Sequence, residues 1–138
     1  MSRIIELRKI ATEFGVQLSE LGPDIDIEDR INHSYAYGCD EIALGIYEDE
    51  ELLVISFFHE LGHCVGSLPP YEECQYDHYK EARAWRVGLA LAADRGITFS
   101  SRALEWAREQ LTSYFKEDCP EHSPLKFLPE ALREAGLR

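Results

Sequence analysis

The sequence lacks long hydrophobic runs and has few basic residues, and each of these absences excludes a class of protein. Its longest apolar stretch, Leu52 to Phe58, is interrupted by Ser56 and is far too short to span a bilayer. Lys and Arg number 14 against 26 Asp and Glu, so the formal net charge is −12. Because so acidic a surface repels phosphate, we expect neither a membrane protein nor a direct nucleic-acid binder.

Cysteine is scarce as well. The chain has four cysteines: Cys39, Cys64, Cys74 and Cys119. No two of them form a C-x-x-C pair, and the first residues meet the charges of Arg3 and Glu6 before any apolar segment long enough for a signal peptide. These features predict a cytoplasmic protein with reduced thiols rather than a secreted disulfide scaffold.

What the sequence does contain is the composition of one globular domain. Its 138 residues are 45% hydrophobic, with no repeat and no low-complexity segment. A chain of this length buries roughly two-thirds of its unfolded surface, which is enough for a core without disulfides. We expect residues 1–138 to form a single domain, with residues 119–138 as a C-terminal tail that packs on it.

Hydrophobic periodicity and helix-capping residues predict a mainly helical chain. Helices are expected over five ranges: 2–14, 49–65, 77–94, 101–115 and 129–135. Two short strands, at 34–37 and 42–46, are joined by a glycine-containing turn, and Ile42, Leu44 and Ile46 are expected on one face. The acidic segment 19–33 is expected to be a loop or a short turn of helix. The fold class is therefore α+β, dominated by helix, with a small antiparallel sheet before the second long helix.

That second helix carries the motif H-E-x-x-H, as His59, Glu60 and His63. Four residues make about one helical turn, so both histidines project from one face and can bind one metal ion. Glu60 lies about 100° around the helix and can reach a water on that ion rather than the ion itself. The motif predicts Zn²⁺ at His59 and His63, with Glu60 as general base and then general acid. The alternative is a pair of helical histidines that bind no metal.

A catalytic zinc of this kind needs a third protein ligand. The metzincin pattern continues with a glycine, matched by Gly66, but places Pro69 at the ligand position, and proline cannot coordinate. The remaining candidates are Asp77, His78 and Glu81, at the start of the next helix. The spacing favours Glu81, 18 residues after the second histidine, because the small residues that follow it permit close helix packing.

Together, the segment 59–63 and the later Glu81-Ala82-Arg83-Ala84-Trp85 resemble the gluzincin arrangement, in the compact form of the ImmA/IrrE-like metallopeptidases of bacteria and phages (minigluzincins). The similarity of element order extends over about residues 1–95. The family's third-ligand segment usually reads E-A-N-x-F-A, and this chain departs from it after the first two residues. The resemblance implies a zincin-like fold in which Glu81 completes the metal site and the strand around Ile42–Tyr47 is the sheet edge beside the cleft.

Other side chains that could take part in chemistry are better explained by their place in the core or at the surface. We expect Cys64, Trp85 and Trp106 to be core residues, and His33 and His122 to be surface histidines or histidines with satisfied hydrogen bonds. A stabiliser for the reaction's oxyanion is sought among Tyr76, His78 and Tyr79.

Two functions follow. The leading hypothesis is a zinc-dependent endopeptidase, a hydrolase that cleaves a cytosolic protein or peptide, and the resemblance suggests a transcriptional repressor as its substrate. The alternative is a zinc-containing regulatory or protein-binding module of the same fold that does not turn over. Glu60 favours the enzyme, because a purely structural zinc needs no base beside its water.

Overall fold

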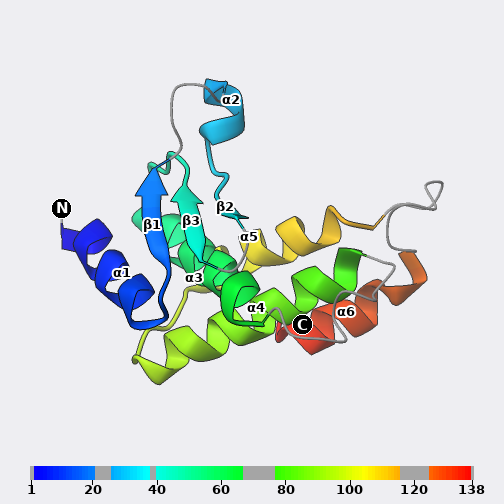
Figure 1. Cartoon of the computed structure of the whole chain (residues 1–138). Helices are drawn as coiled ribbons and strands as arrows, with labels where there is room; N and C mark the ends of the chain where they lie inside the picture. The colour runs from blue at the N-terminus through cyan, green and yellow to red at the C-terminus, as the bar shows by residue number, and fades with distance from the viewer. Residues whose placement is uncertain (1, 21–25, 38–39, 67–76, 116–124, 138) are drawn as a thin grey trace.

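A computed structural model describes residues 2–20, 26–37, 40–66, 77–115 and 125–137, and its elements follow one another from a small sheet into packed helices (Figure 1). The N-terminal part contains α1 (Ser2–Glu13), β1 (Gln17–Glu20), α2 (Ile27–Arg30), β2 (Tyr35–Tyr37) and β3 (Glu41–Leu44). The rest contains α3 (Glu50–Gly66), α4 (Asp77–Asp94), α5 (Ser101–Thr112), the 3₁₀ turn η2 (Leu125–Phe127) and α6 (Leu128–Ala135). The helix-dominated α+β fold is confirmed. No described helix is long and apolar enough to cross a membrane.

The sheet has three strands in the order β1-β3-β2 and is mixed rather than wholly antiparallel. β2 and β3 pair antiparallel, as expected, with Ala36 opposite Ile42. β1, which lies partly in the segment expected to be a loop or a short turn of helix, pairs parallel to β3 with Leu18 opposite Ile42. β3 is therefore the central strand, and the expectation that the strand around Ile42–Tyr47 forms the sheet edge is wrong, because β1 covers its outer side. The edge strand on the other side is β2.

The helix boundaries follow from local capping chemistry. Asp49 Oδ1 accepts hydrogen bonds from the backbone N–H groups of Glu51 and Leu52, which begins α3. Ser100 caps α5 through the N–H of Ala103. Gly136 ends α6 at a φ of 77°, a left-handed conformation that glycine adopts without strain. The predicted helices are confirmed to within a few residues.

α3 and α4 pack against each other through two glycines. A Cβ on Gly62 would collide with the backbone carbonyl of Ala84, and a Cβ on Gly88 would collide with that of Phe58. The pairs 62–84 and 58–88 run in opposite directions along the two helices, so the helices are antiparallel. Glycine at both contacts lets the two backbones approach more closely than any other residue would allow.

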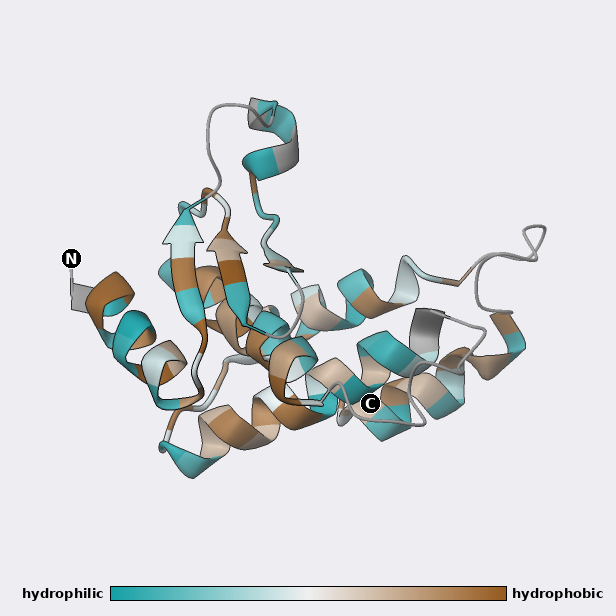
Figure 2. Cartoon of the chain, in the orientation of Figure 1, coloured by the Kyte–Doolittle hydropathy of each residue, from teal (hydrophilic) through white to brown (hydrophobic). Residues whose placement is uncertain are grey.

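Hydrophobic side chains form two clusters on either side of this helix pair. One lies between α1, the sheet and α3 and includes Leu7, Leu44 and Phe57. The other joins α4, α5 and α6 around Trp85 and uses many alanines, so that three helices can pack closely. Figure 2 shows hydrophobic colour on β1 and β3 and along α3 and α4.

Three apolar side chains are more exposed than the periodicity of their elements predicts. Ile46 is 44% exposed because it lies beyond the end of β3, where Ile31 bridges to it instead of a core residue. Phe14 is 36% exposed, in the turn after α1. Ala93 is exposed near the end of α4. Each position lies at or beyond the end of an element, where the periodicity that predicts burial no longer applies.

Candidate metal centre

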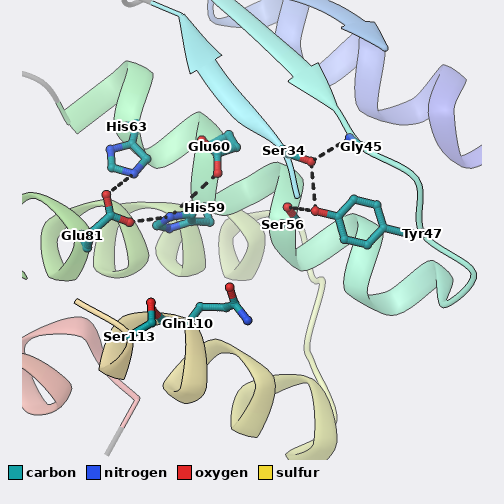
Figure 3. Close-up of polar contacts among 10 residues, drawn as sticks. All are labelled: Ser34, Gly45, Tyr47, Ser56, His59, Glu60, His63, Glu81, Gln110 and Ser113. Carbon is teal, nitrogen blue, oxygen red and sulfur yellow. Dashed lines mark hydrogen bonds and ion pairs between the residues drawn. The ribbon is translucent and has the colours of Figure 1, made fainter. Parts of the chain in front are cut away.

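His59, His63 and Glu81 meet where α3 and α4 cross (Figure 3). The Nε2 atom of His59 lies 3.0 Å from one carboxylate oxygen of Glu81, and the Nε2 atom of His63 lies 3.0 Å from the other. The side chains of His59 and Glu81 are only 11% and 12% exposed, and that of His63 is 20% exposed. The structure thus brings together three of the residues that the sequence singled out.

The electrostatics of this cluster favour charged donors. Burial acts to raise the pKa of Glu81, but hydrogen bonds from His59 and His63 and their charges outweigh it and hold that pKa well below its usual range. Burial acts to lower the pKa of His63, but its hydrogen bond to Glu81 and the carboxylate charges raise it. Glu81 is therefore an ionised carboxylate placed between two imidazoles.

His59 is fixed by aromatic stacking. Its ring lies on that of Trp85 with the centroids 4.0 Å apart and the planes 22° apart. The ring of His63 meets it edge-on at 4.7 Å. The Nδ1 atom of His59 is buried and has no hydrogen-bond partner among the described residues, so packing on Trp85 and the contact of Nε2 with Glu81 orient this ring.

Glu60 is buried beside the cluster. Only 8% of the residue is exposed, and its Oε2 atom lies 3.9 Å from Nε2 of His59. Burial raises the pKa of Glu60, while the neighbouring histidines and the backbone amide of Ala36 on β2 act in the opposite direction. A buried carboxylate whose pKa is raised toward neutrality is suited to taking up and releasing protons.

A chain of hydroxyl groups connects the residue before β2 to α3 beside Glu60 (Figure 3). Ser56, one turn before Glu60, shares a hydrogen bond of 2.6 Å with the Tyr47 hydroxyl, which shares another of 3.0 Å with Ser34. The backbone N–H of Gly45 donates to Ser34 Oγ at 3.1 Å. Burial raises the pKa of Tyr47 despite these hydrogen bonds, so the hydroxyl is protonated and acts as a link between the sheet and the helix.

The cluster opens into a cleft of about 420 Å³ between α3, α4 and the start of β2. Its lining includes His33, Tyr35 and Ala36 on the sheet side and Tyr114, just after α5. The sequence analysis placed His33 at the surface, and the residue is exposed, but it stands at the rim of this cleft. Tyr114 was missed altogether, because nothing in the local sequence shows that the end of α5 returns to the H-E-x-x-H helix.

The other residues that the sequence analysis named lie outside the described residues or away from the metal cluster, with two exceptions beside it. Pro69, Tyr76, Cys39, Cys74, Cys119 and His122 lie outside the described residues, as do the side chains of Asp77 and His78. Tyr79 is 37% exposed and does not line the cleft. Cys64 and Trp85 are buried core residues, as expected, whereas Trp106 is only partly buried and lines a smaller pocket beside the cluster.

The donor set fits a metal ion. The three ligand atoms of His59, His63 and Glu81 lie within 4.8 Å of one another, and two imidazoles with one carboxylate suit a divalent transition metal. Within the described ranges this is the one such group of three His, Cys, Asp or Glu residues. Comparisons with protein-family models, with curated proteins and with solved structures found no match for this chain. The geometry alone therefore shows a centre that could bind a metal ion.

Proposed function

We propose that this chain is a zinc-dependent metallopeptidase of the gluzincin type that hydrolyses a peptide bond in a cytoplasmic protein or peptide. The observation that carries the proposal is the burial of Glu60 beside the donors of His59, His63 and Glu81. The order of small sheet, H-E-x-x-H helix and glutamate-bearing helix supports the resemblance to the ImmA/IrrE-like group. That resemblance also makes a transcriptional repressor our suggested substrate.

His59, His63 and Glu81 would hold the zinc. Two histidines and one glutamate are a ligand set of catalytic zinc sites, in which an open position is kept for substrate or water. When bound, such an ion acts as a Lewis acid and makes water acidic near neutral pH. The ionised state of Glu81 favours cation binding, because the ligands must be deprotonated.

Glu60 is the proton carrier in this proposal. Its carboxylate faces the cleft without belonging to the cluster of three, so it remains available to accept a proton from water and return it to the leaving amine. The raised pKa favours the first of these steps, because a more basic carboxylate takes up a proton from water more readily.

Strand β2 supports a peptide as the substrate. It is an edge strand, and Tyr35 and Ala36 line the cleft beside Glu60. The free side of an edge strand offers backbone hydrogen bonds to an extended chain, which would bring a peptide bond across the cleft.

The test combines metal analysis with Glu60→Gln. We expect about one zinc per chain in the protein purified without chelator, and none in His59→Ala. The wild type should generate new peptide termini in a proteome-derived peptide library analysed by mass spectrometry. Glu60→Gln should keep its zinc and lose cleavage by about 10²–10⁴-fold, the usual contribution of acid–base catalysis.

Glu130→Gln is the matched control, because this exposed glutamate on α6 loses the same charge away from the cleft. It should keep both zinc and cleavage. If Glu60→Gln cleaves as fast as the wild type, the proposed mechanism is wrong. If the zinc-loaded wild type cleaves nothing while it retains a protein partner, the zinc-containing binding module without turnover replaces the peptidase.

A further inference from the structure

A second pocket, of about 140 Å³, lies directly behind the metal cluster. It shares His59, Glu60 and Glu81 with the larger cleft and extends away from them toward α5. A cavity of roughly this volume is known to hold a molecule the size of benzene. The pocket is therefore large enough for one medium-sized side chain of a bound peptide, and too small for a folded segment.

The far wall of this pocket is polar but carries no formal charge. Asn32, before β2, contributes one amide, and Gln110 on α5 contributes another, with Ser113 beside it. In Figure 3 the side chains of Gln110 and Ser113 point from α5 toward the side on which His59 lies. Within the described ranges, no Lys, Arg or Asp lines the pocket.

The two amides are available for a ligand. No hydrogen bond joins the side-chain amide of Asn32 or Gln110 to another described residue, whereas Ser113 Oγ donates to the backbone oxygen of Gln110. An amide that is covered by an apolar group loses its water without gaining a partner, at a cost of about 1–3 kcal/mol. A primary amide, by contrast, donates and accepts at once and can pair with another amide through two hydrogen bonds.

Flat aromatic surfaces complete the pocket. Trp85 and Trp106 both line it, with ring centroids 6.4 Å apart and planes 81° apart. The indole ring of Trp85 also stacks on His59, so the position of this surface is coupled to that of the cluster. Trp85 is only 1% exposed, so it is the partly buried Trp106 against which a planar amide side chain would pack while its edge reaches Gln110.

We propose that this pocket selects an asparagine or glutamine side chain next to the peptide bond that is cleaved, with Gln110 as the specificity-determining residue. The inference rests on the proposed peptidase function, because that function places a peptide in the cleft. It assigns substrate recognition to α5, an element outside the H-E-x-x-H motif and its third-ligand segment.

Zinc-directed probes test the proposal by binding rather than by turnover. Three peptide hydroxamates of one backbone carry glycine, leucine or asparagine at the position next to the hydroxamate, which binds zinc. Leucine and asparagine have nearly the same shape, so their difference reports on polar recognition. We expect calorimetry on the zinc-loaded full chain to give a dissociation constant about tenfold lower for the asparagine probe than for the leucine probe.

Gln110→Met removes the amide while it keeps the length of the side chain, and should abolish this preference. Gln17→Met, at an exposed position on β1 away from the pocket, is the matched control and should preserve it. Equal binding of the asparagine and leucine probes, with the glycine probe also bound, overturns the specificity proposal and leaves the peptidase proposal intact. A preference that persists in Gln110→Met overturns the role of Gln110. If no hydroxamate binds the zinc-loaded protein, the peptidase proposal fails and this inference fails with it.

Discussion

The α3–α4 wall, which carries the metal cluster, and the far wall of the second pocket differ in charge and in how their side chains are held. On the α3–α4 wall, His59, His63 and Glu81 are largely buried and contact one another at 3.0 Å. On the far wall, Asn32 and Gln110 are uncharged and have no side-chain hydrogen bonds to other described residues. One wall is fully organised before any ligand arrives, while the other offers unused hydrogen-bonding groups.

We interpret the α3–α4 wall as the proposed site of chemistry and the far wall as the proposed site of ligand recognition. Charged groups cost much free energy to bury, so they are tolerated on the α3–α4 wall only because they pair with one another there and could bind a cation. Neutral amides cost little free energy when they face water, so the amides on the far wall can stay without a protein partner until a ligand binds. The first wall is therefore expected to respond to mutation through metal binding and stability, and the second through ligand preference.

The largest effect is expected when the negative charge of Glu81 is removed from the α3–α4 wall. Glu81→Gln keeps the size of the side chain but removes the carboxylate between the histidines, and should weaken zinc binding by more than the 10–100-fold that loss of a supporting group typically costs. Competition with a fluorescent zinc chelator measures this. Glu130→Gln should bind zinc like the wild type.

The variant His78→Ala tests whether Glu81 or another residue at the start of α4 is the third zinc ligand. We expect zinc affinity to stay close to that of the wild type in this variant and in Asp77→Asn. Loss of zinc in His78→Ala together with retention in Glu81→Gln would reject the gluzincin assignment.

A smaller effect should follow from changing the contact that holds the two helices together. Gly62→Ala introduces a Cβ into the backbone carbonyl of Ala84, and overpacking of this kind typically costs about 1–3 kcal/mol of unfolding free energy. Urea denaturation of the zinc-free protein measures the loss.

Gly66→Ala is the matched control in the same helix. Its Cβ would lie 3.4 Å from the nearest atom of Val87, an ordinary contact, and alanine has the higher helix propensity. We expect this variant to be as stable as the wild type or more stable. Equal destabilisation of the two variants would show that close packing at Gly62 is not what joins the helices.

The smallest effect should come from the link between the sheet and α3. Tyr47→Phe removes the hydroxyl that joins Ser34 to Ser56 and leaves both serines short of a partner, at a cost of about 1–2 kcal/mol. Thermal denaturation measures the change. Tyr37→Phe, at a position 45% exposed on β2, should have no measurable effect. If the two variants melt at the same temperature, the hydroxyl chain does not stabilise the fold.

The sequence by itself determined the local features. The spacing of His59 and His63 placed both on one helical face because an α-helix repeats every 3.6 residues. The capping serine at Ser100 and the left-handed glycine at Gly136 set helix ends through hydrogen bonds within a few residues. Glu81 was favoured as the third donor because the small residues that follow it permit its helix to pack closely on the first.

Tertiary structure decided which segments face each other. β1 was missed because its four residues, Gln17–Glu20, have little hydrophobic pattern and gain their strand conformation from pairing with β3. That pairing moved β3 to the centre of the sheet and made β2 the edge at the cleft. The places of Gln110 and Tyr114 beside the metal cluster depend on α5 packing against α3 across a separation of about a third of the chain, and contacts that distant leave no periodic trace in the sequence.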